Sequence, residues 1–441
     1  MRPGRHARLG YTFAVGAILV ALVVFSLGLY EALVRMRVDL PGRFLQISML
    51  ILLGFLLVLI VRYFGLLWFS YLSLLEDELD VGAAGFPLVT ILVPAFNEAA
   101  VIQGSIRSLL QLDYPHYEII VIDDGSKDDT YRKAVVFEGS HGKAEVRVIH
   151  KKNGGKSRAL NAGIAAASGE FVLCMDGDSA LHPLTLRRAV RHLADPRVAA
   201  VAGSVKVVNR TNLLSSLQAL EYVEGLNMVR AAQGFFRLVN IIPGPIGVFR
   251  LAALRRVGGY DHDTFAEDCD LTLKLLASGW QVHYEPESIA YTEAPEKLLD
   301  LLKQRYRWTR GILQAIRKHR DTLLRPTRSP AMAVTLAYMV FEGILWPSMN
   351  VFAHVLFVIV ATRFGAALPL VLWWAQLTVL DLAAALYCVA VEEERLALVP
   401  YAILYRAFFA LTIDVAKLFA TFEEVLRLRM DWGKLERIGR I

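Results

Sequence analysis

The chain has 441 residues, of which 55% are hydrophobic and 20% are charged, and its formal net charge is +6 at pH 7. A mean hydropathy of +0.43 is too high for an ordinary soluble enzyme, and the charged fraction is too large for a protein made only of membrane helices. The Lys/Arg excess lies largely beside apolar segments, so we expect anionic lipid headgroups as its partner and no nucleic acid.

Two apolar stretches stand near the start of the chain, at residues 11–30 and 44–61. Because the second stretch follows the first directly, two retained helices fit better than a cleaved signal peptide. We therefore predict two transmembrane helices within residues 1–75, followed by a linker at residues 82–87.

We predict a globular domain over residues 88–328, in which short strands alternate with helices. The predicted strands are rich in β-branched residues and end at polar loops, at 89–93, 118–122, 145–149 and 170–175. Helices are predicted at 99–110 and 156–167. This alternation indicates an α/β fold with a mainly parallel sheet. Ligands of such sheets bind beyond the C-terminal strand ends, where the acidic motifs of this chain fall.

The last part of the chain is again apolar, in three stretches at 331–362, 364–391 and 396–422. They predict about three transmembrane helices within residues 331–425 and a basic tail at 426–441. The positive-inside rule places that tail in the cytoplasm, whereas two plus three spans place it outside. Two alternatives stay open: the first stretch is broken into two spans at Pro347, or the last stretch does not cross.

Two carboxylates, Asp176 and Asp178, follow the predicted strand 170–175. If that strand stays extended, both side chains point to the same side, because residues two apart share a face. A pair of carboxylates with few other protein ligands suits Mg²⁺ or Mn²⁺ held together with substrate phosphates. The alternative is a polar exit from the strand into a turn.

Two further polar motifs follow predicted strands. Asp124, within the Asp-Asp-Gly-Ser sequence at 123–126, can accept hydrogen bonds from a base or ribose, although an ordinary turn uses the same residues. The Asn-Gly-Gly-Lys-Ser sequence at 153–157 is no Walker phosphate loop, because His150 stands where that motif needs Gly. It predicts a glycine turn that places Lys156 near a phosphate at a helix N-terminus, or else a solvated lysine.

Glu267 and Asp268 precede an apolar run at 271–277 that predicts a helix. Asp268 then lies near the helix N-terminus, where the helix dipole favours the ionised carboxylate. An ionised carboxylate in a cleft can act as a general base. The alternative is plain N-capping, which is the commoner use of an isolated Asp at this position.

A Gln-x-x-Arg-Trp sequence stands just before the apolar C-terminal third. Gln304, Arg307 and Trp308 share one helical face at spacings of three and four. Arg offers a forked cation for a diphosphate, and Trp offers a flat apolar surface for a sugar ring. A second interpretation, which can hold at the same time, is an interfacial amphipathic helix at the end of the domain whose basic residues meet lipid headgroups. Those basic residues are Lys303, Arg305, Arg310, Arg317, Lys318 and Arg320.

In this order, the motifs resemble those of the membrane-integrated family 2 glycosyltransferases, which include the poly-N-acetylglucosamine, hyaluronan and cellulose synthases. The resemblance covers roughly residues 88–318 together with the flanking spans. It implies a GT-A fold and an inverting transfer from a UDP-sugar, with Mg²⁺ or Mn²⁺ as the cofactor.

The resemblance implies a donor site and an acceptor site. On the donor side, Asp124 matches the acid that contacts uridine, Asp176 and Asp178 match the pair that holds the metal and diphosphate, and Arg307 matches the diphosphate-binding arginine. Lys156 belongs to the same nucleotide-sugar site.

On the acceptor side, Asp268, beside Glu267, matches the base that deprotonates the acceptor hydroxyl, and Trp308, with Gln304, lies under the acceptor sugar. The chain departs from the family pattern at Ala266, where Thr is common. It also departs at Pro245, where a small residue is usual, which weakens any transfer of detail about the acceptor loop.

We therefore expect an enzyme that moves a hexose or N-acetylhexosamine from a UDP-sugar to a growing polysaccharide, processively and coupled to export. We expect a multi-pass protein of the inner (plasma) membrane with its catalytic domain in the cytoplasm, in contact with membrane lipids and accessory export proteins. One alternative is a single addition to a lipid acceptor such as ceramide, diacylglycerol or a polyprenyl phosphate. Another is an inactive sensor or scaffold, but such relics usually lose acidic residues and here every acidic motif is present.

Overall fold

The computed structural model describes residues 5–35, 42–76, 85–327, 329–365 and 367–428. The chain divides into two units, residues 1–68 with 346–415 and residues 69–345 with 416–441. The predicted linker at 82–87 lies partly outside the described residues, and the predicted basic tail at 426–441 lies mostly outside them.

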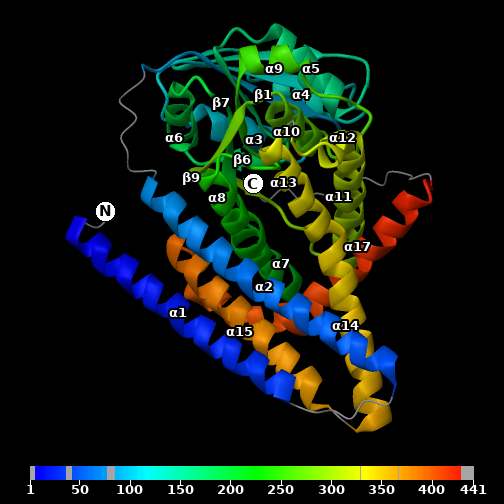
Figure 1. The fold of residues 1–441 in the computed structure, drawn as a ribbon. Coiled ribbons are helices and arrows are strands. Elements are labelled where there is room, and N and C mark those ends of the chain that lie inside the picture. The colour runs from blue at the N-terminus through cyan, green and yellow to red at the C-terminus, as the bar shows by residue number, and fades with distance from the viewer. Residues whose placement is uncertain (1–4, 36–41, 77–84, 328, 366, 429–441) are drawn as a thin grey trace. The chain divides into compact units, whose positions relative to one another are not determined.

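Among the described residues, nine strands of the second unit form one sheet (Figure 1). They are β1 (Val89–Ala95), β2 (Tyr117–Asp123), β3 (Gly139–His141), β4 (Ala144–His150), β5 (Phe171–Cys174), β6 (Ser179–Leu181), β7 (Val198–Val207), β8 (Gly247–Arg250) and β9 (Gln281–Thr292). Their order is β3-β4-β2-β1-β5-β8-β7-β9-β6. β1 pairs in parallel with β2 and β5, β2 with β4, and β7 with β9. The sheet is mixed and mainly parallel, which confirms the predicted fold class.

The helices of this unit lie between the strands in the chain or follow the last of them. They are α3 (Ile102–Leu110), α4 (Thr130–Val135), α5 (Lys156–Ala166), α6 (Thr185–Val190), α7 (Leu213–Leu220), α8 (Met228–Phe235), α9 (Leu251–Val257), α10 (Glu267–Ala277), α11 (Leu298–Lys318), α12 (Arg320–Leu324) and α13 (Pro330–Val340), with a 3-10 turn η1 (Arg191–Ala194) and a π-helical turn η2 (Glu221–Asn227). The predicted strands and helices correspond to β1, β2, β4, β5, α3 and α5, with ends that differ by about three residues at most.

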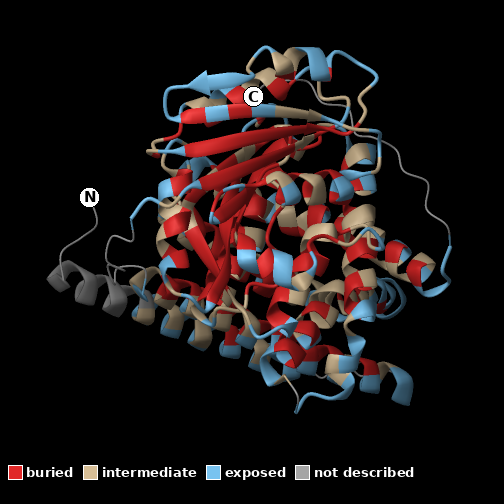
Figure 2. Cartoon of the chain, turned by 90° about the horizontal axis from the view of Figure 1, so that it is seen from above, coloured by how far each residue is buried: buried red, intermediate tan, exposed pale blue. Residues whose placement is uncertain are grey.

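The central strands form because their side chains are apolar and covered on both faces. β2 is buried at every position and β1 at all but one, and both consist mainly of Val, Ile and Leu. This pattern is typical of parallel strands between two layers of helices. Figure 2 shows the central strands buried along most of their length.

The parallel register brings the C-terminal ends of the strands to one edge. Ala95 of β1 pairs with Asp123 of β2, which pairs with His150 of β4, and Leu92 of β1 pairs with Cys174 of β5. The polar residues that follow these strands therefore gather at that edge of the sheet.

In the described part of the chain, four helices are long and apolar enough to cross a membrane, which suggests a multi-pass membrane protein. They are Arg43–Glu76, Pro330–Phe364, Leu368–Val391 and Leu396–Val425. They consist of α2 (Arg43–Glu76), α13, η3 (Phe341–Leu345), α14 (Trp346–Phe364), α15 (Leu368–Val391), η4 (Leu396–Leu398), α16 (Tyr401–Leu404), η5 (Tyr405–Phe409) and α17 (Ala410–Val425). The first helix, α1 (Arg5–Arg35), contains a shorter apolar stretch at Gly16–Ala32.

Pro347 does not end a helix, although a break there was one of the two alternatives left by the sequence. Pro330–Phe364 is one continuous helix in which the π-helical turn η3 precedes Pro347. Proline cannot donate a backbone hydrogen bond within the helix, and the wider π-helical turn offers a way to accommodate it.

A buried ion pair lies among the apolar helices of the first unit. Arg406 donates from Nε to Oδ2 of Asp381 at 2.7 Å and from Nη2 to Oδ1 at 2.8 Å. The Tyr63 hydroxyl donates to Oδ1 of Asp381 at 2.6 Å. Because Asp381 is 0% exposed and Arg406 only 2%, each charge depends on the other for its stability.

We predict that Asp381→Asn and Arg406→Met each lower the thermal unfolding temperature of the detergent-solubilised protein. Each change leaves a buried charge without its partner, at a cost of about 3–5 kcal/mol. The double variant Asp381→Leu with Arg406→Met removes both charges, so it should recover most of the loss. A double variant less stable than either single variant contradicts this account of the pair.

Candidate active site

A small cavity, partly open to solvent, lies at the sheet edge beyond β5. Its charged lining residues are Lys156, Asp176, Glu267 and Asp268. They come from the first residue of α5, the loop after β5 and the first two residues of α10. Three segments that are far apart in the sequence therefore supply one cluster of ionisable groups.

Lys156 connects the carboxylates of this cluster. Its Nζ lies 2.6 Å from Oδ1 of Asp176 and 2.9 Å from Oε1 of Glu267. Burial acts to lower the pKa of Lys156, but the carboxylates of Asp176, Glu267 and Asp268 raise it well above its ordinary value. The site therefore contains a permanent positive charge between acidic side chains.

Asp268 is the carboxylate whose ionisation is shifted toward neutral pH. Burial, followed by the Glu267 carboxylate, raises the pKa of Asp268 to about 6, although Lys156 opposes the shift. The N-cap of α10 is Ala266, so Asp268 does not cap the helix, and its Oδ1 accepts from the N–H of Cys269 at 2.8 Å. A carboxylate with this pKa is ionised at neutral pH and is basic enough to accept a proton.

Asp176 and Asp178 do not lie on an extended strand, so the prediction that they share one strand face is wrong. β5 ends at Cys174, and the N–H of Ser179 donates to the carbonyl of Asp176 at 3.1 Å, which closes a turn. The chain has to turn here because β6, which begins at Ser179, pairs with β9 and not with a neighbour of β5. The cavity lining includes Asp176 but not Asp178.

Gly244 lets a loop approach the Lys156–Asp176 pair closely. A Cβ at Gly244 would lie 2.8 Å from Oδ2 of Asp176 and 3.1 Å from Nζ of Lys156. A larger residue would require the loop or the ends of these two side chains to move. Pro245, where the chain departs from the family pattern, is the next residue along this loop.

Asp124 supports the loop at residues 151–155. Its carboxylate accepts from the N–H of Gly155 at 2.7 Å and of Gly154 at 3.0 Å, and it pairs with Lys151. With an exposed fraction of 3%, Asp124 holds the glycine turn that leads into α5 and Lys156. Its contact with a uridine stays a prediction.

The Gln-x-x-Arg-Trp residues lie on α11, as predicted, and Arg305 connects two of them. Its guanidinium carbon lies 4.2 Å from the centre of the Trp308 ring, and its Nη1 donates to Oε1 of Gln304 at 2.6 Å. Arg305 is 3% exposed and pairs with Glu221 of η2. Arg307 is half-buried on the same helix. The roles of Gln304, Arg307 and Trp308 toward donor and acceptor stay predictions.

Several basic residues of α11 are paired within the protein, so the alternative that they meet lipid headgroups is wrong for them. Arg305 and Arg310 are each 3% exposed and pair with Glu221 and Glu424. A buried guanidinium needs a carboxylate partner, and the sequence spacing alone did not reveal that these partners exist.

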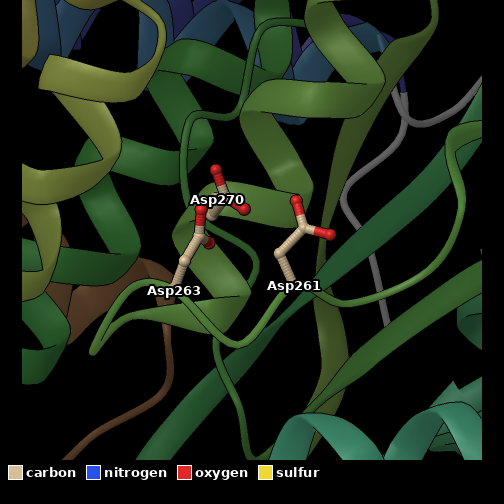
Figure 3. Close-up of side chains that lie close together, drawn as sticks. All are labelled: Asp261, Asp263 and Asp270. Atoms are coloured by element: carbon tan, nitrogen blue, oxygen red, sulfur yellow. The ribbon is translucent and has the colours of Figure 1, made fainter.

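A second acidic cluster lies near the start of α10, where Asp261, Asp263 and Asp270 come together (Figure 3). Their oxygens lie within 4.8 Å of one another, a spacing that could hold a metal ion. Lys318 Nζ, however, lies 2.7, 2.9 and 2.8 Å from the three carboxylates. An ammonium group therefore already balances this cluster.

The family of the chain follows from its match over the globular domain. Residues 87–311, more than half of the 441 residues, match the family described as glycosyltransferase like family 2. The chain belongs to this family and is a glycosyltransferase.

Among its relatives are poly-β-1,6-N-acetyl-D-glucosamine synthases of two staphylococci. The protein of Staphylococcus epidermidis is 32% identical over 226 residues, which are 51% of this chain and 54% of that protein. The protein of Staphylococcus aureus (strain COL) is 29% identical over 275 residues, 62% of this chain and 65% of that protein. The matched segment thus spans less than two thirds of either relative.

A mannosyltransferase from Pyrobaculum calidifontis, solved with GDP-mannose and Mn²⁺, has a similar fold. Its TM-score is 0.57 at 20% sequence identity, and the match covers 94% of this chain and 100% of that chain. The globular domain therefore has a GT-A-like fold, with long apolar helices before and after it.

We predict that turnover is lost as the pH falls through about 6. Below the raised pKa of Asp268 its carboxylate is protonated and cannot accept a proton, whereas above that pH the base is available. The measurement is kcat/KM for nucleotide release between about pH 3 and about pH 8. If kcat/KM instead falls only near pH 4, where an ordinary Asp ionises, the loss of activity does not come from Asp268.

Proposed function

We propose that the protein transfers a hexose or N-acetylhexosamine from a UDP-sugar to the growing end of a polysaccharide, with inversion at the transferred carbon. The observation that supports this best is the cavity in which Lys156, Asp176, Glu267 and Asp268 converge. It combines a fixed cation for a phosphate with a carboxylate of raised pKa, at the sheet edge where such folds bind ligands. Similarity to poly-β-1,6-N-acetyl-D-glucosamine synthases supports the choice of donor and product.

Phosphate binding is assigned to two positively charged side chains of the chain. Lys156 presents its ammonium group at the start of α5, and Arg307 adds a forked guanidinium from α11. Asp124 orders the loop before Lys156 and contacts the uridine. In this scheme the diphosphate leaves with its charge balanced by protein cations.

The donor set also fits a divalent metal ion. Asp176 and Asp178 offer the oxygen ligands that Mg²⁺ and Mn²⁺ prefer, and the missing Cβ of Gly244 leaves space beside Oδ2 of Asp176. When bound, the ion supplies positive charge to the departing diphosphate.

Asp268 acts as the general base. Its carboxylate takes the proton of the acceptor hydroxyl, the acceptor oxygen bonds to the sugar carbon, and the bond from that carbon to the diphosphate breaks. Burial and the like-charge repulsion of Glu267 raise the pKa of Asp268, and the ion pair with Lys156 holds Glu267 in place. Trp308 and Gln304 orient the acceptor sugar.

We place the catalytic domain in the cytoplasm at the inner membrane, with the product leaving through the apolar helices. The four long apolar helices and the similarity to polymer synthases support this placement. The other candidate, a single addition to a lipid acceptor, needs the same site and differs in the size of its product.

We predict that Asp268→Asn lowers transfer by at least about 100-fold, because an amide cannot accept the proton at neutral pH. The UDP dissociation constant should stay within about twofold, since Lys156 and Asp176 are unchanged. Initial rates and calorimetric UDP binding measure the two effects. Undiminished turnover in this variant rules out the role of Asp268.

We predict that membranes containing the protein release UDP from one member of a panel of UDP-sugars and form a polymer. A chelator should stop the reaction, and added Mg²⁺ or Mn²⁺ should restore it. Mass spectrometry of the product separates the two candidate functions, because one sugar per lipid contradicts the polymer. Full activity in chelator contradicts the metal site.

A further inference from the structure

Helix α11 is in direct backbone contact with the residues that precede Glu267 and Asp268. A Cβ at Gly311 would lie 2.5 Å from the backbone nitrogen of Ala266 and 2.6 Å from its Cβ. Neither atom can move without moving the chain that leads into α10. The position of the first turn of α10 therefore depends on α11.

One turn further along α11, the side chain of Gln314 binds the same segment. Its Oε1 accepts from the backbone N–H of Phe265 at 3.0 Å, three residues before Asp268. Its Nε2 donates to Oε2 of Glu424 at 3.0 Å. Because an ionised carboxylate only accepts hydrogen bonds, Glu424 determines which end of the Gln314 amide faces Phe265.

Glu424 is a buried carboxylate that binds three side chains of α11. Besides Gln314, it pairs with Nε of Arg310 at 3.0 Å and with Nη2 of Arg317 at 2.9 Å. Glu424 is 5% exposed, and Arg310 also donates to the carbonyl of Leu428 at 2.6 Å. The end of α17 is thus attached to the face of α11 that carries Gln314.

A second set of contacts connects α11 to α10 beyond Asp268. Nζ of Lys318 lies 2.8 Å from Oδ2 of Asp270, and Nε2 of His319 lies 3.0 Å from its Oδ1. The contacts at Phe265 and at Asp270 lie on either side of Asp268 in the chain. The backbone that carries Asp268 is therefore held at both ends by α11 and the residue after it.

We propose that Gln314, oriented by Glu424, is a positioning residue for the carboxylates of Glu267 and Asp268. Gln314 does not line the cavity, and it acts through the backbone of Phe265 and Ala266. The inference rests on the proposed function, because that function assigns the base to Asp268. Since a displacement of about 1 Å at a catalytic group can cost about 100-fold in rate, loss of this contact should lower turnover and leave nucleotide binding intact.

The test uses the full-length protein in detergent or native membranes. Gln314→Leu leaves the N–H of Phe265 without an acceptor, and we expect kcat to fall at least about tenfold while the UDP dissociation constant changes by less than about twofold. Glu424→Gln should lower kcat less strongly, because the new amide no longer specifies the orientation of Gln314. The matched control is Glu423→Gln, which changes the neighbouring carboxylate. Glu423 accepts from Tyr306 and lies 3.8 Å from Nη1 of Arg310, and its contacts among the described residues do not include Gln314.

Exchanging the side chains of Gln314 and Glu424 tests whether the hydrogen bond between them is what matters. In Gln314→Glu alone, two carboxylates face each other, so kcat should fall. In the double variant Gln314→Glu with Glu424→Gln, the carboxylate accepts from Phe265 and the amide donates to it, so kcat should recover to within about threefold of wild type. A double variant as slow as Gln314→Glu overturns the proposal.

Amide hydrogen exchange gives a readout that does not depend on activity. The peptide that contains Phe265 should exchange faster in Gln314→Leu than in wild type, and at the wild-type rate in Glu423→Gln. Unchanged exchange in Gln314→Leu overturns the positioning role. If wild type transfers sugar and Gln314→Leu keeps its full kcat, only this inference fails. If wild type releases UDP from no nucleotide sugar, the proposed function fails instead.

Discussion

The arrangement of the site depends on one ammonium group. Nζ of Lys156 lies within 3 Å of carboxylate oxygens from two other segments, Asp176 after β5 and Glu267 at the start of α10. Without a cation between them, these carboxylates and Asp268 would repel one another, and the loop that contains Gly244 could not lie so close. Burial and the Glu267 carboxylate raise the pKa of Asp268 against the effect of Lys156, and the same Lys156 supplies the charge that a phosphate would meet.

Helix α11 connects the site to other elements of its unit through ion pairs. Its charged residues do not face outward as a group, because Arg305, Arg310 and Lys318 are paired with carboxylates of η2, α17 and the start of α10. Each of these pairs joins elements that are distant in sequence. By composition this helix would serve as an amphipathic surface segment. Instead it connects the proposed acceptor residues, the proposed base and the end of the last apolar helix.

Much of the fold was predictable from local pattern. Apolar runs of β-branched residues identified β1, β2, β4 and β5, and long apolar stretches identified the helices that can cross a membrane. β3 was not predicted because it is only three residues long, in a short hairpin with β4. β6 to β9 were not predicted because they pair with strands far away in the chain. A turn after β5 was the alternative that the sequence left open at Asp176 and Asp178, and the pairing of β6 with β9 decides in its favour.

The sequence by itself determined which chemical groups the protein contains. They are the carboxylates after the strands, the lysine at the start of α5 and the Gln-x-x-Arg-Trp residues. It determined their helices and strands as well, because hydrophobic periodicity is a local property. Only the tertiary structure decided which groups meet. Lys156, Asp176 and Glu267 form ion pairs, Arg305 lies against Trp308, and Gln314 reaches Phe265. Distance and burial set these interactions and their pKa shifts, and both arise only when remote segments pack together.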